Sequence, residues 1–203
     1  MAKKTESLRE RRKRETLQEI HAAALRLASE HGFEKITVEM ISEEAGVSTR
    51  TFFNYFPNKE SAVVRGLPTL SAAGVDAFVA PGPGHPREVL ADLTEFLVTE
   101  LAQNPPERAE MHAVRQLALQ SPVVRTALLA GIEAFQQGVT AAAAQRLGVD
   151  EHDEVPKLMS SLAIAAVRTG LERWSAAEPG HGDDSMVPYI RRAMDLMHTL
   201  LTP

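Results

Sequence analysis

Hydroxyl, guanidinium, amide and phenol side chains are concentrated in residues 48–55 of this 203-residue chain, which read STRTFFNY. Serine, threonine and asparagine form helix less readily than the Glu and Lys that usually cover a solvated helix, so the segment must gain something else from them. Arginine can donate two parallel hydrogen bonds to guanine, asparagine suits adenine, and threonine can bond a base edge or touch a thymine methyl group. These residue types therefore favour contact with DNA.

Two short helices joined by a tight turn are predicted to position these side chains. Thr37 is expected to cap the first helix, Gly46 to form the turn, Ser48 to cap the second helix and Pro57 to end it. Asn58 is expected to cap a further helix that begins at Lys59. Apolar residues lie behind the pair at the spacing of a shared core, namely Ile41, Ala45, Val47, Phe52 and Phe56. This pattern is typical of a helix-turn-helix, in which the first helix holds the second so that its N-terminal half can enter the major groove.

The first 14 residues form a basic arm. They hold seven Lys and Arg against two Glu, whereas residues 61–203 carry eleven basic and seventeen acidic groups. Because the chain as a whole has a net charge of −5, we expect it to approach a polyanion with its basic N-terminal end first. The alternative is that the basic run is only a solvated tail. Capping boxes at Ser7–Glu10 and Thr16–Glu19 could each begin the first helix. The earlier start makes the arm helical and the later one leaves it free, and the sequence leaves both open.

Helical spacing of apolar residues recurs along nearly the whole chain, and no segment alternates as a strand would, so we expect an all-α fold. The expected organisation is a basic arm at 1–14, a three-helix helix-turn-helix domain at 15–60, and a larger helical domain at 61–203. A kink or break is expected around Pro68 and Gly74, and a loop at 81–86, PGPGHP.

The predicted helix over residues 158–174 is apolar on two faces. One stripe holds Leu158, Leu162 and Ala165, and the other holds Ile164, Val167, Leu171 and Trp174. A helix that is apolar on two faces must be covered on both. One cover is its own domain, and the other could be a second copy of the chain.

The sequence favours no enzyme, metal or cofactor. It has no cysteine, which excludes disulfides, zinc–thiolate sites and cysteine nucleophiles. It has none of the G-x-S-x-G, P-loop, H-E-x-x-H or dinucleotide glycine patterns. No apolar run approaches the roughly 20 residues of a membrane span, and the charged N-terminus is no signal peptide. A cytoplasmic, non-enzymatic protein is therefore expected.

Residues 46–60, GVSTRTFFNYFPNKE, resemble the signature of the TetR family of bacterial one-component repressors. The family pattern also includes the small and apolar first helix, Gly32-Phe33 near its end, and Thr37. The specific resemblance covers residues 15–65, and the rest of the chain matches in length, in its all-helical layout and in the paired C-terminal helices.

The resemblance assigns roles in DNA binding. It implies phosphate contacts for Thr37, Tyr55 and Lys59. It implies phosphate or base-edge contacts for Ser48, Thr49, Arg50, Thr51 and Asn54, with Arg50 the best candidate for direct base readout. Phe53 stands where the family often has Tyr, so its ring could pack on a sugar or thymine methyl but lacks the hydroxyl. Arg11, Arg12 and Arg14 could follow the adjacent minor groove and add affinity with little sequence information.

The resemblance also implies a homodimer through the last two helices, a palindromic double-stranded DNA operator, and release by a small-molecule effector. Candidate effector contacts are Phe96, Met111, Phe135 and Trp174, with His112, Arg115 and Arg168 as polar anchors. Many Ala and Met residues with few aromatic ones favour a flexible, lipophilic effector. The TFFNYFP segment is similar to an actinobacterial subgroup, some members of which respond to acyl-CoA thioesters. The alternative function is a module that binds or sequesters a small molecule without regulating DNA.

Overall fold

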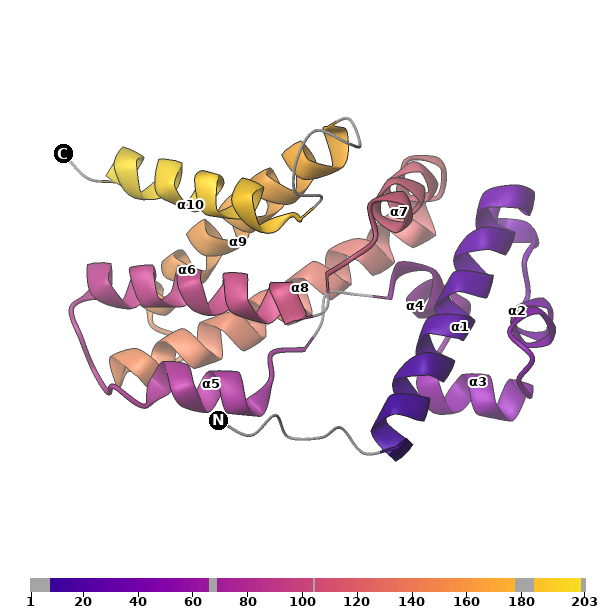
Figure 1. The fold of residues 1–203 in the computed structure, drawn as a ribbon, viewed down its shortest axis with the longest axis horizontal. Coiled ribbons are helices and arrows are strands. Elements are labelled where there is room, and N and C mark those ends of the chain that lie inside the picture. Colours follow the sequence, from indigo (N-terminus) through magenta and orange to yellow (C-terminus); the bar gives the residue numbers. More distant parts are fainter. Residues whose placement is uncertain (1–7, 66–68, 104, 178–184, 202–203) are drawn as a thin grey trace. The chain divides into compact units, whose positions relative to one another are not determined.

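The computed structural model describes residues 8–65, 69–103, 105–177 and 185–201. Within these ranges the chain forms α-helices and one short 3-10 helix, and no strand (Figure 1). The all-α prediction is confirmed. The elements are α1 Leu8–His31, η1 Phe33–Lys35, α2 Val38–Glu44, α3 Thr49–Tyr55, α4 Lys59–Val64, α5 Ala72–Val79, α6 Pro86–Gln103, α7 Arg108–Gln120, α8 Pro122–Leu147, α9 Glu154–Ala176 and α10 Val187–Leu201.

The helices divide between two compact units. The first unit contains residues 1–66 together with 109–131, and the second contains 67–108 and 132–203. The first unit therefore includes α7 except for Arg108, and the first residues of α8, all of which the sequence-based division places in the larger domain at 61–203. The helix-turn-helix is braced by more of the chain than the three helices expected from its sequence pattern.

The core of the first unit lies between α1, α2, α3 and α4. Ile20 of α1, Ile41 of α2, Phe52 of α3 and Val63 of α4 are each completely buried in it. Residues 33–36 between α1 and α2 add Phe33 and Ile36 to the same core, and α7 contributes Val114 and Leu117. Burial of this apolar surface fixes the angle between α2 and α3.

The earlier of the two possible starts of α1 is the observed one. The helix begins at Leu8, so Arg11, Arg12 and Arg14 are all helical, while residues 1–7 of the arm, including Ser7, lie outside the described residues. The helix ends before Gly32, whose φ of 86° is a conformation that favours glycine. The basic side chains thus project from the N-terminal end of a helix whose later residues, beginning with Ile20, are buried in the core.

In the second unit α9 packs against α10 and α6. The inward stripe of α9 is buried, as predicted: it holds Ile164, Val167, Leu171 and Trp174. Gly170 lets the backbones approach closely, because a Cβ there would lie 2.5 Å from Ile190 Cα and 2.9 Å from the Tyr189 carbonyl oxygen. The outward stripe differs, since Leu158 and Ala165 are exposed and Leu162 is half-buried.

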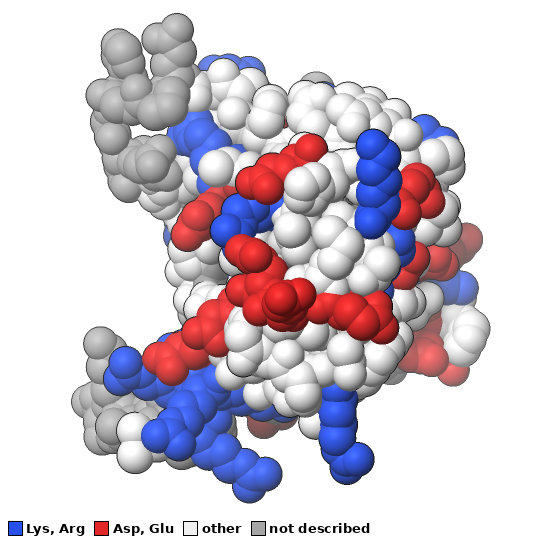
Figure 2. All heavy atoms as spheres, turned by 90° about the vertical axis from the view of Figure 1, so that its right-hand side faces the viewer, with Lys and Arg blue, Asp and Glu red and all other residues white. Residues whose placement is uncertain are grey.

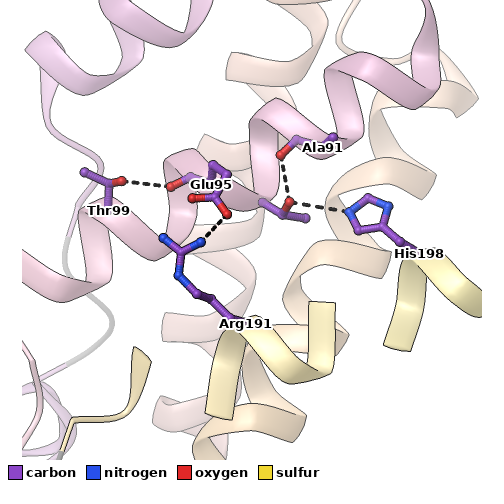
Figure 3. Close-up of polar contacts among 6 residues, drawn as sticks. Ala91, Glu95, Thr99, Arg191 and His198 are labelled. Atoms are coloured by element: carbon purple, nitrogen blue, oxygen red, sulfur yellow. Dashed lines mark hydrogen bonds and ion pairs between the residues drawn. The ribbon is translucent and has the colours of Figure 1, made fainter. Parts of the chain in front are cut away.

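Polar contacts also join α6 to α10 (Figure 3). Arg191 on α10 donates to a Glu95 carboxylate oxygen on α6 at 2.5 Å. One residue earlier on α6, the buried Thr94 hydroxyl donates to the Ala91 carbonyl and lies 3.5 Å from His198 Nε2. Figure 3 shows these contacts bridging one side of α6 and the facing side of α10. They add polar contacts with α6 to the packing of α10 on α9.

The chain does break between α4 and α5, since α4 ends at Val64 and α5 begins at Ala72, but Gly74 itself lies inside α5. Ser71 caps α5 by accepting from the Gly74 amide at 3.0 Å, and it donates its own amide to Glu100 on α6 at 2.7 Å. A Cβ at Gly74 would overlap the Glu100 carboxylate. Glycine is therefore used here for the close approach of α6 and not to end a helix. Pro68 lies outside the described residues.

Among the residues that the structure describes, no helix combines the length and the apolar character needed to cross a membrane.

Candidate nucleic-acid interface

Side-chain hydrogen bonds cap the N-terminal ends of α2, α3 and α4. The Thr37 hydroxyl accepts from the Met40 amide at 3.3 Å at the start of α2, and the Ser48 hydroxyl accepts from the Thr51 amide at 3.0 Å at the start of α3. Asn58 caps α4 through the Ser61 amide at 2.8 Å. Each of these caps is confirmed. They satisfy amides that a helix start leaves without a partner, and so hold α2, α3 and α4 at fixed starting residues.

The polar face of α3 is exposed, while its other face is core. Thr49, Arg50 and Asn54 are exposed, and Thr51 and Tyr55 are half-buried. The Ser48 and Thr51 hydroxyls lie 2.8 Å apart and bond each other. Of the side chains in the first turn of α3, those of Thr49 and Arg50 are therefore the most open to a ligand.

The three phenylalanines in and just after α3 lie on different faces of the helix: two are buried and one is exposed. Phe52 is fully buried and Phe56 nearly so, with ring centroids 6.0 Å apart, which confirms both as the brace. Phe53 is 57% exposed and meets Phe52 edge-on at 5.4 Å. The exposed Phe53 ring therefore lies next to Asn54 on the outer face of α3. In this position it is open to contact with a sugar or a thymine methyl group of DNA.

Lys59 has a structural contact that the sequence pattern did not reveal. Its Nζ donates to the Phe33 carbonyl at 3.1 Å and to the Ile36 carbonyl at 2.9 Å, and lies 4.5 Å from the centre of the Phe33 ring. The ammonium group thus ties the start of α4 to the segment between α1 and α2. Phosphate contact by Lys59 stays a prediction, and it must share the ammonium group with these carbonyls.

An exposed carboxylate beside Thr37 was also missed by the sequence analysis. A hydrogen bond with its own backbone amide, followed by one with the Thr37 side chain, holds the pKa of the Glu39 carboxyl below its ordinary value. Glu39 is therefore ionised at neutral pH, next to a hydroxyl that is predicted to contact phosphate. Its position in the first turn of α2 was the available signal, since acidic residues favour helix starts.

Glu39→Gln is expected to strengthen binding to any DNA duplex by roughly two- to fivefold at low ionic strength, because it removes a negative charge near the phosphates. The gain should shrink as salt is added. Fluorescence anisotropy with a random duplex at two ionic strengths measures it. Glu88→Gln, the same change in the first turn of α6, is the matched control and should leave affinity unchanged. Equal affinities of wild type and Glu39→Gln would place the start of α2 away from the phosphates.

Basic side chains cluster at one edge of the face drawn in Figure 2. The figure shows a cluster of Lys and Arg at the lower edge and a band of Asp and Glu above it, with further Lys and Arg beside and above that band. Arg9, Arg11, Arg12, Lys13 and Arg14 at the start of α1 are all exposed, and Arg11 also pairs with Glu15 at 2.7 Å. The exposed acids include Glu39, Glu43 and Glu44 of α2. A polyanion is attracted to the basic edge and repelled from the band, so the charges restrict how DNA can approach.

The predicted effector contacts are divided between the two units. Met111, His112 and Arg115 lie in the first unit, where Met111 is half-buried and the other two are exposed. Phe96, Phe135, Arg168 and Trp174 lie in the second unit. Phe96 is half-buried and stacks on Phe78 at 5.2 Å, Phe135 and Trp174 are buried, and Arg168 is exposed.

Trp174 also has a structural role. The Arg108 guanidinium lies 4.8 Å from the centre of its ring and donates to the carbonyl oxygens of Trp174 and Ala177. Arg108 thereby satisfies carbonyls at the C-terminal end of α9, where a cation is favoured.

Comparisons with known proteins agree with this geometry. Residues 20–63 match the family described as bacterial regulatory proteins, tetR family, and residues 87–202 match the family described as the MftR C-terminal domain. The chain is 26% identical over 172 residues to the HTH-type transcriptional regulator TcmR of Streptomyces glaucescens, covering 82% of this chain and 76% of the relative. It is 30% identical over 90 residues to the uncharacterised HTH-type transcriptional regulator Rv1556 of Mycobacterium tuberculosis, covering 42% of this chain and 41% of the relative.

A TetR-family regulator of Syntrophomonas wolfei, known from a crystal structure, has the same fold, with a TM-score of 0.54 over 93% of this chain and 95% of the other at 18% identity. The matched ranges include the helix-turn-helix and most of the second unit. The chain is a transcriptional regulator that belongs to the TetR family.

Proposed function

We propose that the protein is a cytoplasmic, ligand-responsive repressor that binds a near-palindromic operator as a homodimer and is released by a small lipophilic effector. The observation that carries the DNA-binding part is the two-faced α3: Phe52 is fully buried behind it, while Arg50 and its polar neighbours face outward. Arg50 is proposed to contact guanine, with Thr49, Thr51 and Asn54 at neighbouring base edges or phosphates. Thr37, Ser48, Tyr55 and Lys59 are proposed to contact phosphates, and Phe53 a sugar or thymine methyl.

Enrichment of bound duplexes from a random-sequence pool tests this proposal. Two identical recognition helices on a symmetric dimer should select an inverted repeat whose half-site centres lie about 34–36 Å apart, or a multiple of that distance. Enrichment of no inverted repeat would contradict the regulator reading and favour the alternative, a module that sequesters a small molecule. Repeating the selection with acyl-CoA and other lipophilic ligands tests the effector. A ligand that both raises the melting temperature and releases DNA supports repression relieved by that ligand.

The dimer is proposed to form through α9 and α10, because their outward faces carry exposed leucines. Leu158 is 63% exposed on α9, and Leu200 is 85% exposed on α10. Leu196 and Leu201 of α10 are exposed as well. Burial of such side chains against a second copy is favourable by about 1.5–3 kcal/mol for each leucine that becomes fully buried.

Leu158→Asp is expected to convert the dimer to a monomer and to weaken operator binding, while the fold survives because the side chain is exposed. Size-exclusion chromatography with light scattering measures the mass, and circular dichroism checks the helix content. Leu129→Asp is the matched control, since Leu129 is a leucine of α8 that is 60% exposed but lies outside α9 and α10. A dimeric Leu158→Asp protein, or a monomeric Leu129→Asp protein, would move the interface elsewhere.

The effector site is proposed to lie in the second unit, where Phe96, Phe135 and Trp174 supply apolar surface and Arg168 a positive charge. Phe96 is the first of these to test, because its stacked ring is half-buried and thus still partly open. A lipophilic effector suits a site of this composition, because small-molecule sites are lined mainly by apolar and aromatic side chains with a few polar or charged groups.

A further inference from the structure

His21 is a buried polar residue in the middle of α1 that the sequence pattern does not mark. It is 3% exposed, and both ring nitrogens have partners from other helices of the same unit. Nδ1 lies 2.7 Å from the Ala62 carbonyl oxygen of α4, and Nε2 lies 2.6 Å from Glu110 Oε1 at the start of α7. Three helices therefore meet at one imidazole.

The partners of the ring determine where its protons lie. A carbonyl oxygen can only accept, so Nδ1 must carry a hydrogen. The short link between Nε2 and Glu110 then needs one further proton, either on the ring, which gives an imidazolium and a carboxylate, or on the carboxyl group, which gives two neutral groups.

The surrounding charges favour the ionic form. Ala62 lies in the last turn of α4, whose carbonyls lack intrahelical partners and favour a cation. Arg65, the residue that ends α4, places its Nη1 3.8 Å from Glu110 Oε1 and so stabilises a carboxylate there. Glu110 of α7 contacts the His21 ring directly, and Arg65 at the end of α4 contacts the same carboxylate oxygen. The Glu110 carboxylate thus lies between the His21 ring of α1 and the Arg65 guanidinium at the end of α4.

We propose that the His21 imidazolium and the Glu110 carboxylate form an ionic tether through which α7 holds the C-terminal end of α4 and thereby positions the helix-turn-helix for operator binding. His21 lies on α1 and Glu110 on α7, away from the exposed face of α3 that is proposed to contact DNA. They are therefore positioning residues, which act on DNA binding through other helices. This inference rests on the proposed function, because it assigns to α7 a part in setting operator affinity. It adds a contact by which changes at α7 reach α4, whose first residue, Lys59, is tied to the segment between α1 and α2.

Nitrogen-15 NMR of the wild-type protein labelled at histidine tests the protonation state. At neutral pH both ring nitrogens of His21 are expected to carry a proton, which distinguishes an imidazolium from a neutral ring. A neutral His21 ring with one bare nitrogen overturns the tether. This measurement needs neither DNA nor a variant, so it stands even if the proposed function fails.

A double-mutant cycle tests the positioning role. His21→Asn keeps a donor near the Ala62 carbonyl but loses the Glu110 contact, and Glu110→Gln removes the charge while keeping a hydrogen-bonding group. Each single change is expected to weaken operator binding by about tenfold, and the double variant no further, because both remove the same interaction. Gln116→Asn, at an exposed position of α7 with no proposed role, is the control and should bind as wild type does.

The cycle is measured well below the melting temperatures of all four proteins, with melting followed separately by circular dichroism. A merely structural pair would lower the melting temperature and leave the affinity of the folded protein unchanged, and that result overturns the proposal. Additive losses in affinity overturn it as well. Failure of the wild-type protein to bind any DNA would instead contradict the proposed function, and the NMR result would then decide the tether alone.

Discussion

Arg50→Ala is expected to weaken operator binding by about 1–3 kcal/mol, or roughly 5- to 150-fold, and to remove the preference for one base pair in each half-site. The exposed guanidinium can donate two hydrogen bonds to one guanine, and alanine can replace neither of them. Stability should hardly change, because the side chain is exposed on a helix whose brace is intact. Competition binding with the enriched operator and with single-base-pair variants of it measures both effects.

The matched control for Arg50→Ala is Arg12→Ala in the basic arm. It removes the same charge from an exposed position of a helix, but we expect that residue to contact phosphate only. Its loss should be uniform across sequences and should lower the salt dependence of binding by about one counterion. Arg50→Lys adds a second comparison, because lysine keeps the charge without the planar pair of donors. Equal losses from Arg50→Ala on every sequence would show that Arg50 contacts phosphate and does not read a base.

Much of the helix-turn-helix could be predicted because its determinants are local. Thr37, Ser48 and Asn58 cap helices whose first amides follow within three residues, and the helical spacing of Phe52 and Phe56 places both on one face. Such signals depend on short stretches of chain and survive without knowledge of the tertiary fold. The same holds for the two stripes of α9, where the inward one is buried and the outward one largely exposed.

The contacts that could not be predicted join residues far apart in sequence. His21 and Glu110 are separated by 89 positions, and Lys59 reaches carbonyls 23 and 26 positions earlier. Every residue type has a backbone carbonyl, so the sequence does not show which carbonyls will accept a hydrogen bond from Lys59. Nothing in the sequence therefore marks Lys59 as a structural residue. Gly74 gave a false signal for the same reason, because a close approach by Glu100 requires glycine there and only the fold reveals it.

Effector contacts were harder to predict than DNA contacts, because most apolar residues of an all-helical domain are buried in its core and do not contact a ligand. Trp174 is buried beneath Arg108, and Phe135 is buried within its own unit. The division between units also depends on long-range packing, which is why Met111, His112 and Arg115 lie with the helix-turn-helix in the first unit. Residue type alone does not distinguish a ligand contact from a packed side chain.

Gly170→Ala is expected to lower the free energy of unfolding by about 2–4 kcal/mol, toward the upper end of the overpacking range. The added Cβ would lie 2.5 Å from Ile190 Cα and 2.8 Å from Ile190 N, and these backbone atoms cannot rotate away as a flexible side chain could. The two helices must therefore separate. The melting temperature should fall by about 5–15 °C, which thermal unfolding followed by circular dichroism measures.

Gly138→Ala is the matched control, since it makes the same change inside α8, where the added Cβ would only touch Leu70 Cδ1 at an ordinary 3.7 Å. That variant should gain about 0.5–1 kcal/mol, because alanine favours helix over glycine. Opposite signs for the two variants would show that close approach of α9 and α10, and not helix propensity, decides the outcome. Because α9 and α10 also carry the proposed dimer surface, separating them should weaken dimerisation in the folded Gly170→Ala protein as well. If Gly170→Ala instead gains stability as Gly138→Ala does, α9 and α10 do not pack as closely as this structure places them.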